Sequence, residues 1–347
     1  MKKPIWIAIA LLFSIIVFKL LSAVIPASGV FHTLESKLVE SCKAVNIFAG
    51  TEDVEIDENT NLVFVSAYNR RTPSGSDGIF VFDLQQKNSP RYSVRKVSPT
   101  ELLDFHPHGI SLWHGEGQTK LFVINHRTTG ENVVEIFNVG EGGVLEHLES
   151  ISFGAMNSPN DLVAVGPRQF YASNDHGYLS GIMMILEQYF ALPFANAVYF
   201  DGNKGRIIKS GLVAANGINR SADGKIIYIS EALKQRISVF DRNIETGELT
   251  KTKHININSV PDNIDVDANG YLWVAGHSKI FEFVAHSEDL SLIAPSHIIK
   301  VDSSTGMLED IFISLNGEIN AASVGATHNN TLVVGAVFDG HVMVCPL

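Results

Sequence analysis

Residues 216–232 read NGINRSADGKIIYISEA, in which a polar opener and a turn precede a short strand of β-branched and aromatic residues. Comparable strands begin at residues 62, 121, 170, 272 and 332, and each is bounded by Gly, Asn or Asp. The polar openers before them, at 52, 108, 160, 216, 262 and 323, recur 46 to 61 residues apart. A loose period near fifty residues, with about four strands in each unit, is typical of a β-propeller blade. The chain is therefore predicted to be all-β, with residues 40–347 forming a single six-bladed β-propeller.

The composition is that of a globular protein with an ample core, since 45% of the 347 residues are hydrophobic. The formal net charge is −11, from 37 acidic and 26 basic residues. A nucleic-acid-binding protein would need a basic face, so no nucleic-acid partner is expected. The excess of carboxylates also suits a chain that neutralises a bound divalent cation.

Residues 1–28 form a separate hydrophobic segment. Two lysines precede an apolar run from Ile5 to Phe18, and a second apolar piece reaches Ile25. A cleaved signal peptide and an uncleaved signal-anchor helix both fit this charge and length, and the two alternatives stay open. Either one predicts the secretory pathway, with the rest of the chain extracellular, periplasmic or membrane-anchored and facing an oxidising compartment.

The sequence has two cysteines, Cys42 and Cys345, near the two ends of the predicted propeller. In a secreted chain they would most simply form one disulfide that latches the ring, and the alternative is two unpaired buried thiols. Asn219 and Asn329 begin N-glycosylation sequons, which matter only in a host that performs this chemistry.

One segment departs from the strand pattern. Residues 178–200 are apolar over a longer stretch than any blade strand, and Glu187 is their one acidic residue. They predict a helical insertion, which either packs on the propeller rim or covers one mouth of the central channel. We expect the second arrangement, in which the insertion meets substrate or a lipid surface.

The openers carry side chains that a propeller would bring together, because the innermost strand of each blade lines the central channel. Carboxylates and Asn amides are hard oxygen ligands, which select Ca²⁺ or Mg²⁺ over zinc. Asp and Asn are also ordinary turn formers, so a single pair would carry little weight. The candidate residues at this shared position are Glu52, Asp53, His108, Asn160, Asp161, Asn216, Asp262 and Asn263.

Alternation along a strand predicts two ions. Successive strand residues point to opposite faces, so Glu52 and Asp53 would serve different ions, as would Asn160 and Asp161. We therefore expect two calcium ions stacked along the channel axis. The exposed one would be held by Glu52, Asn160, Asn216, Asp262 and Asn263, and the buried one by Asp53 and Asp161.

Two histidines occupy the same end of one blade, His108 in FHPHGI and His126 in VINH. An imidazole with a pKa of about 6.5 takes a proton from water near neutral pH, so both are candidate catalytic bases, His108 more directly than His126. A lone histidine is more often structural. The sequence has no GxSxG or CxxC motif and no phosphate-binding glycine loop, so a covalent serine mechanism has no support.

Taken together, these motifs resemble the paraoxonase (arylesterase) family of six-bladed propeller lactonases. The similarity runs from about Cys42 to Leu347, and it includes EDVEI, FHPHGISL, VINH, PNDLVAVGPRQFYASNDH, PDNIDVD and LWVAGH in that order. The resemblance implies a catalytic calcium at Glu52, Asn160, Asn216, Asp262 and Asn263, and a structural calcium at Asp53, Asp161 and the backbone carbonyl of Ile110. It also implies a His108–His126 dyad, the Cys42–Cys345 disulfide, and lipid attachment through the N-terminal helix and residues 178–200.

The predicted function is calcium-dependent hydrolysis of small lactones and aryl esters, by attack of water activated by His108 or Glu52 on a metal-polarised carbonyl. The alternatives are a propeller of different specificity, resembling gluconolactonases or strictosidine synthase, and a non-enzymatic ligand- or lipid-binding module. Arg70 and Arg71 stand where an aromatic residue is expected nearby, and Ala214 and Ala215 stand where a bulky aromatic is usual. These departures bear on substrate preference more than on chemistry.

Overall fold

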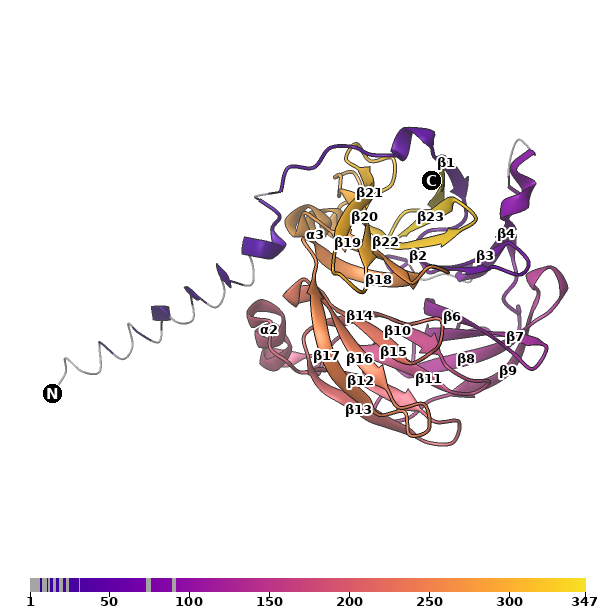
Figure 1. Cartoon of the computed structure of the whole chain (residues 1–347), viewed down its shortest axis with the longest axis horizontal. Helices are drawn as coiled ribbons and strands as arrows, with labels where there is room; N and C mark the ends of the chain where they lie inside the picture. The colour runs from indigo at the N-terminus through magenta and orange to yellow at the C-terminus, as the bar shows by residue number, and fades with distance from the viewer. Residues whose placement is uncertain are drawn as a thin grey trace.

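The computed structural model describes residues 25–30, 32–72, 76–88 and 92–347, together with residues 7, 11, 13, 14, 17, 18, 21 and 22. Six antiparallel sheets of four strands confirm the six-bladed propeller (Figure 1). The α-helices of the propeller are α2 (Gly181–Phe190) and α3 (Ile280–Glu288), and short 3-10 turns occur at η1 (Val39–Ser41), η2 (Leu84–Asn88), η3 (Glu141–Gly143) and η4 (Ala232–Lys234).

Each blade runs from an inner strand at the channel to an outer strand at the rim. In that order, the first blade consists of β2 (Thr51–Asp57), β3 (Leu62–Ala67), β4 (Gly78–Asp83) and β5 (Arg95–Lys96). The second consists of β6 (Pro107–Gly115), β7 (Gln118–His126), β8 (Asn132–Val139) and β9 (Leu145–Ile151). The third consists of β10 (Pro159–Ala164), β11 (Phe170–Asn174), β12 (Ala195–Phe200) and β13 (Gly205–Leu212). The fourth consists of β14 (Ala215–Arg220), β15 (Ile226–Glu231), β16 (Arg236–Arg242) and β17 (Leu249–Asn256). The fifth consists of β18 (Val260–Val266), β19 (Tyr271–His277), β20 (Ser296–Asp302) and β21 (Leu308–Ser314). The sixth consists of β22 (Ala322–His328), β23 (Thr331–Ala336), β24 (His341–Pro346) and β1 (Lys43–Asn46).

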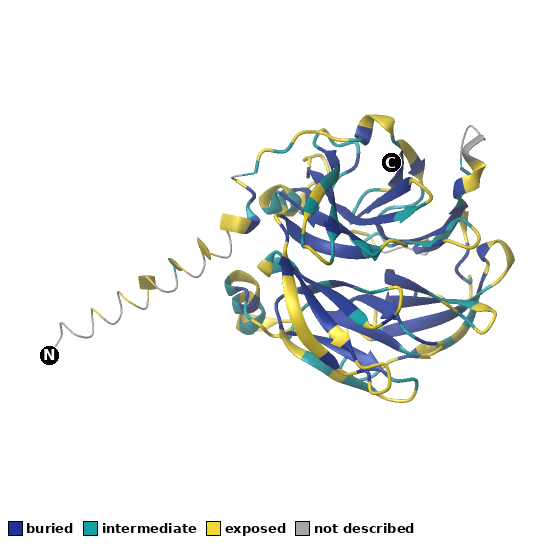
Figure 2. Ribbon diagram, in the orientation of Figure 1, coloured by how far each residue is buried: buried dark blue, intermediate teal, exposed yellow. Residues whose placement is uncertain are grey.

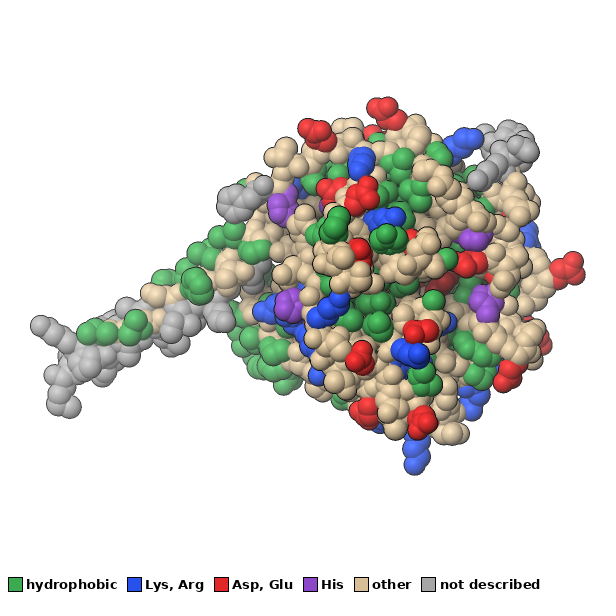
Figure 3. Space-filling model, viewed as in Figure 1, with side chains coloured by type: hydrophobic (Ala, Val, Ile, Leu, Met, Phe, Trp, Pro, Cys, Tyr) green, Lys and Arg blue, Asp and Glu red, His purple; other side chains and the backbone are tan. Residues whose placement is uncertain are grey.

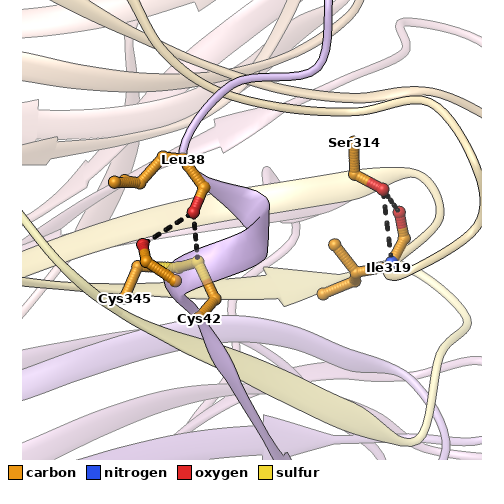
Figure 4. The surroundings of a disulfide bond; sticks show 6 residues. Leu38, Cys42, Ser314, Ile319 and Cys345 are labelled. Carbon is orange, nitrogen blue, oxygen red and sulfur yellow. Dashed lines mark hydrogen bonds between the residues drawn. A yellow bond between two sulfur atoms is a disulfide. The ribbon is translucent and has the colours of Figure 1, made fainter.

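The ring closes through both ends of the chain. The inner strands pack against one another in order, from β2 through β6, β10, β14 and β18 to β22, and β22 contacts β2. The last blade takes its outer strand from the N-terminal side, where Val45 of β1 lies opposite Val342 of β24. Cys42 and Cys345 form a disulfide beside this pairing, with Leu38 next to it (Figure 4). The predicted latch is thus confirmed, and a disulfide is consistent with an oxidising compartment.

Hydrophobic side chains fill the space between neighbouring blades. Phe122 of β7 and Phe170 of β11 belong to different blades, yet both are fully buried and their ring centres lie 6.2 Å apart. The inner and middle strands are mostly buried, whereas the outer strand β17 is exposed over most of its length (Figure 2). Apolar burial stabilises by roughly 25 cal/mol per Å², so packing between the blades fixes the positions of the inner strands.

The connections after β3, β11 and β19 begin next to the openers, because the end of each second strand pairs with the start of its inner strand, as Ala67 pairs with Thr51. Two of these connections contain α2 and α3, which lie on the same side of the molecule in Figure 1. The apolar stretch 178–200 is a helix only at Gly181–Phe190, and its last part is strand β12 (Ala195–Phe200). Every residue of β12 is buried, and such a strand has no alternation that distinguishes it from a helix.

Most of the predicted N-terminal helix at residues 1–28 lies outside the described residues, so its nature stays a prediction. No helix in the described part of the chain is long and apolar enough to span a membrane. From residue 26 the chain is tied to the propeller: Gln235 donates to the carbonyl of Pro26 at 3.4 Å, and Lys279 donates to the carbonyls of Gly29 and His32 at 2.6 and 3.1 Å.

The two sequons have different environments. Asn219 lies on the inner strand β14, and its amide nitrogen donates to the carbonyl of Ile264 at 2.8 Å. A glycan on Asn219 would have to break this bond inside the channel. Asn329 lies in the exposed turn between β22 and β23, where a glycan would meet no such obstacle. Glycosylation at Asn329 therefore stays a prediction.

Candidate active site

Every inner strand leaves regular pairing at its opener. The pairing of β2 with β3 skips between Thr51 and Asp53, and the other five inner strands have an irregularity at the equivalent point. Such bulges take residues out of the ladder and redirect their side chains. The residues within these irregular steps include Glu52, His108, Asn160, Asn216, Asp262, Asn263 and Ser323.

Two glycines let neighbouring inner strands approach at the bulges. A Cβ atom added at Gly109 would lie 2.7 Å from the Cα of Asp161, and one at Gly217 would lie 2.5 Å from the carbonyl oxygen of Asp262. No other residue fits a backbone approach this close. The glycines therefore bring the openers of adjacent blades into contact around the channel.

Four buried oxygens, each from a different inner strand, accept no hydrogen bond from any described residue. They are Glu52 Oε2, Asn160 Oδ1, Asn216 Oδ1 and Asn263 Oδ1. A buried acceptor left unpaired costs about 1–3 kcal/mol, so four at the same position of their strands require a common partner. A hard cation fits, because carboxylate and amide oxygens are the ligands that Ca²⁺ prefers. A cluster of three or more His, Cys, Asp or Glu side chains suited to a metal does not occur among the described residues, which makes amide oxygens the main donors.

Asp53 and Asp161 share one arrangement next to these four oxygens, which we call the oxygen ring. Each carboxylate accepts the N–H of the following residue and an N–H of the next inner strand, which is Ile110 for Asp53 and Ile218 for Asp161, both at 2.7 Å. Burial raises the pKa of both carboxyls well above the usual range, and the charges of Glu52 on Asp53 and of Asp53 on Asp161 add to the rise. A cation between these groups would offset the charge repulsion.

His108 and His126 are hydrogen-bonded, with 2.8 Å between His108 Nδ1 and His126 Nε2. His126 Nδ1 lies 2.8 Å from the amide oxygen of Asn132, whose nitrogen donates to two backbone carbonyls. The proton of His126 is therefore on Nδ1, its Nε2 accepts from Nδ1 of His108, and Nε2 is the nitrogen of His108 that is left for other partners. That nitrogen lies 3.4 Å from Oε1 of Glu52. Burial and the charge of His108 lower the pKa of His126 to about 4, so His126 is neutral near pH 7.

Glu52 connects the histidines to the oxygen ring. Its Oε1 accepts from the amide nitrogen of Asn263 at 3.2 Å, and Ser323 donates to its backbone carbonyl at 2.6 Å. Burial acts to raise the pKa of Glu52, but the charges of His108 and Arg70 outweigh this effect and leave the pKa below its ordinary value. Glu52 is therefore an ionised carboxylate near neutral pH.

Sequence reasoning missed the serines that support the ring. Ser66 and Ser173 occupy equivalent positions in the second strands of their blades, and they accept the N–H groups of Asp53 and Asp161 at 3.1 and 3.3 Å. Ser230 is at the same position in another blade. The signal was present in the sequence, because this serine recurs in LVFVSAY, FYASND and IIYISEA.

His277 is also closer to the site than its sequence position indicated. Its Nε2 lies 2.9 Å from Oδ2 of Asp262, and its ring packs on Phe283 of α3 with 4.0 Å between ring centres. Since Nε2 donates to the carboxylate, His277 orients Asp262 within the ring.

A cavity of about 260 Å³ lies at the end of the channel opposite the openers, and it is lined by Glu55, Asp265 and Arg220 among others. Burial raises the pKa of Asp265 to about 7, and burial together with the charge of Asp265 raises that of Glu55. None of the four unpaired oxygens and neither histidine of the pair lines this cavity. The candidate site is therefore at the opener end of the channel, and the cavity of about 260 Å³ is at the opposite end.

Fold and site together define a class: six-bladed propellers that present an oxygen-lined site and a hydrogen-bonded histidine pair at one end of the central channel. A sequence model of the arylesterase family matches residues 35–347, and the chain belongs to this family. It is 30% identical to human serum paraoxonase/arylesterase 2 over 318 residues, 88% of each chain, and 31% identical to mouse serum paraoxonase/arylesterase 1 over 312 residues, 86% of each chain.

Solved structures support the fold independently. A putative gluconolactonase is similar with a TM-score of 0.57 and 15% sequence identity, over 88% of this chain and 91% of the other. The predicted family and the predicted class of enzyme, a carboxylic ester hydrolase, are thus confirmed.

Proposed function

We propose that the chain is a calcium-dependent hydrolase of lactones and aryl esters, with its reaction centre between the oxygen ring and the His108–His126 pair. The observation that carries this proposal is the set of four unpaired buried oxygens beside His108, whose Nε2 lies 3.4 Å from Oε1 of Glu52. Calcium bound there would polarise the substrate carbonyl and stabilise the oxyanion. The ligands would be Glu52, Asn160, Asn216, Asp262 and Asn263.

The chain itself supplies the base. His108 Nε2 takes a proton from water while the water oxygen attacks the carbonyl carbon, and the adjacent carboxylate of Glu52 stabilises the imidazolium that forms. His126 holds the proton of His108 on Nδ1, so that Nε2 stays free to accept. Glu52 is the alternative base, because its carboxylate lies at the same place.

A second calcium, at Asp53, Asp161 and the carbonyl of Ile110, would be structural. Both carboxylates are already bonded to backbone N–H groups of two adjacent inner strands. An ion there would join these strands and relieve the repulsion that raises the two pKa values.

Two substitutions test the proposal. Asp262→Ala removes a ligand and should abolish lactone hydrolysis and lower calcium content, whereas His108→Gln should keep the calcium and slow hydrolysis by about 10²- to 10⁴-fold. Full activity in His108→Gln would remove His108 from the mechanism. Bound calcium without turnover of any lactone or ester in the native chain would favour a binding module instead.

We also propose that a lipid surface contacts the rim of this mouth. Large apolar residues are exposed on α2 and α3, among them Ile182, Ile185, Phe281 and Val284, and Figure 3 shows hydrophobic side chains gathered at α2. Exposed apolar patches of this kind mark interaction sites. Flotation with phosphatidylcholine vesicles should fall when Ile182 and Ile185 are changed to Gln, and unchanged flotation would contradict this role for α2.

A further inference from the structure

The connection between β3 and β4 carries two adjacent arginines, and one of them is used entirely for structure. Arg71 donates to the carbonyls of His286, Ser287 and Glu288 at the C-terminal end of α3, at 2.7 Å for His286 and 3.3 Å for Glu288. Its guanidinium also lies 5.4 Å from the ring centre of Phe338. A cation is favourable at a helix C-terminus, so Arg71 fixes the loop against α3.

Arg70 is not used in this way. Its Nη1 donates to the carbonyl of Val337 at 3.3 Å, but its buried Nη2 has no acceptor among the described residues. The carboxylate of Glu52 is 3.9 Å from Nη2, which is beyond hydrogen-bond distance. The side chain of Arg70 is 22% exposed as a whole, and its unfilled hydrogen-bonding capacity is at the buried Nη2, on the side of Glu52.

A small cavity adjoins this free donor. It has a volume of about 140 Å³, and both arginines line it together with Tyr68, Leu290 and Phe338. Its walls are thus largely apolar, and Arg70, whose Nη2 forms an ion pair with Glu52 at 3.9 Å but no hydrogen bond, brings a guanidinium with a spare donor to it.

We propose that this cavity and Arg70 bind a carboxylate carried by the substrate, so that the preferred substrates are lactones or esters with an acidic side arm. This inference rests on the proposed hydrolase function. A guanidinium binds a carboxylate through two parallel N–H donors, and here the apolar walls would hold the carbon chain that joins the carboxylate to the ring. In the reaction, water adds to the lactone carbonyl, the ring C–O bond breaks, and the alkoxide takes the proton, which gives a hydroxy-dicarboxylate.

A calcium ion on Glu52 would make Arg70 available to an anionic arm. The ion would repel Arg70 and weaken its attraction to that carboxylate, which leaves the guanidinium available to another anion. The net charge of −11 repels anions in general, so the attraction for this arm must come locally from Arg70.

The test uses a matched pair of substrates, a γ-butyrolactone that carries a short carboxyalkyl chain on its γ carbon and the methyl ester of that carboxylate. The measured quantity is the ratio of their kcat/KM values in the native chain and in Arg70→Gln and Arg70→Lys. Arg206→Gln is the control, because Arg206 lies exposed on an outer strand. We expect the native chain to prefer the carboxylate, and Arg70→Gln to lower the ratio by roughly 10-fold or more, mainly through KM.

Arg70→Lys should restore part of the preference, and Arg206→Gln should leave it unchanged. A ratio that does not change in Arg70→Gln, or a native preference for the methyl ester, would overturn the inference. Calorimetry with a cyclopentanone carboxylate of the same shape, which has no bond to hydrolyse, separates the two proposals. If the native chain hydrolyses neither lactone, the proposed function fails. Loss of cyclopentanone carboxylate binding in Arg70→Gln would still support the carboxylate subsite. Binding of this ligand that is retained in Arg70→Gln would refute the subsite.

Discussion

Asn160→Leu should have opposite effects on stability with and without calcium. The substitution keeps the approximate size of the side chain and removes one of the four unpaired buried oxygens. In the metal-free chain this removes a desolvation cost, so the variant should be more stable than the native chain. In the calcium-bound chain it removes a ligand, so the variant should be less stable.

The size of each effect follows from the environment of Asn160. An unpaired buried acceptor costs about 1–3 kcal/mol, and the lower end applies because the residue as a whole is only partly buried. An increase of about 1 kcal/mol in the free energy of unfolding raises Tm by roughly 1–3 °C in a chain of this size. With calcium, a tenfold weaker Kd would remove about 1.4 kcal/mol of the stabilisation supplied by the ion.

The assay is thermal unfolding of both proteins, once with a calcium chelator and once with millimolar Ca²⁺. Asn174→Leu is the matched control, because Asn174 is a buried asparagine whose amide donates to Ala155 and Asn196 and accepts from Ser158. That variant should lose stability in both conditions. If Asn160→Leu also loses stability in both, its oxygen is not a calcium ligand and the assignment of the ring is wrong.

Three further outcomes follow from the structure. Because folding raises the pKa values of Asp53 and Asp161, these two carboxyls bind more protons in the folded metal-free chain than in the unfolded chain, and their contribution to stability should fall as pH rises above about 4. Protons and calcium compete for these carboxylates, so the Tm increment from calcium should grow with pH, and an increment independent of pH would contradict the buried site. Replacing Cys42 and Cys345 by Ser should lower the free energy of unfolding by roughly 2–5 kcal/mol in urea titrations, and an unchanged value would show that the latch is dispensable. His126→Gln keeps an acceptor for the neighbouring histidine, so lactone turnover should fall only about tenfold, and a complete loss would mean that His126 itself takes the proton.

The propeller could be predicted because one local requirement recurs in every blade. Each inner strand begins with a bulge, and bulges favour Asn, Asp and Gly, so the openers are visible as a period in the sequence. The assignment of Glu52 and Asp53 to two different ions rested on strand alternation and stays a prediction, since a bulge interrupts the pairing between Thr51 and Asp53. The structure gives these residues separate partners, with His108 beside Glu52 and Ile110 beside Asp53.

The remaining features depend on contacts between distant parts of the chain, which spacing does not encode. The hydrogen bond between His277 and Asp262 depends on how two strands of one blade pair, and the anchoring of the Arg70–Arg71 loop through Arg71 depends on where α3 ends. Strand β12 reads as the end of a helix because packing against neighbouring blades buries both of its faces. These features became visible only once the blades were assembled.

The most direct measurement is hydrolysis of a panel of γ- and δ-lactones by the purified full chain in detergent, before and after calcium is chelated and then restored. We expect turnover that is lost on chelation and recovered with Ca²⁺, with an activity loss in His108→Gln that calcium does not reverse. Turnover that persists in excess chelator, after the chain is shown to be free of metal, would contradict the claim that the oxygen ring acts through a bound cation.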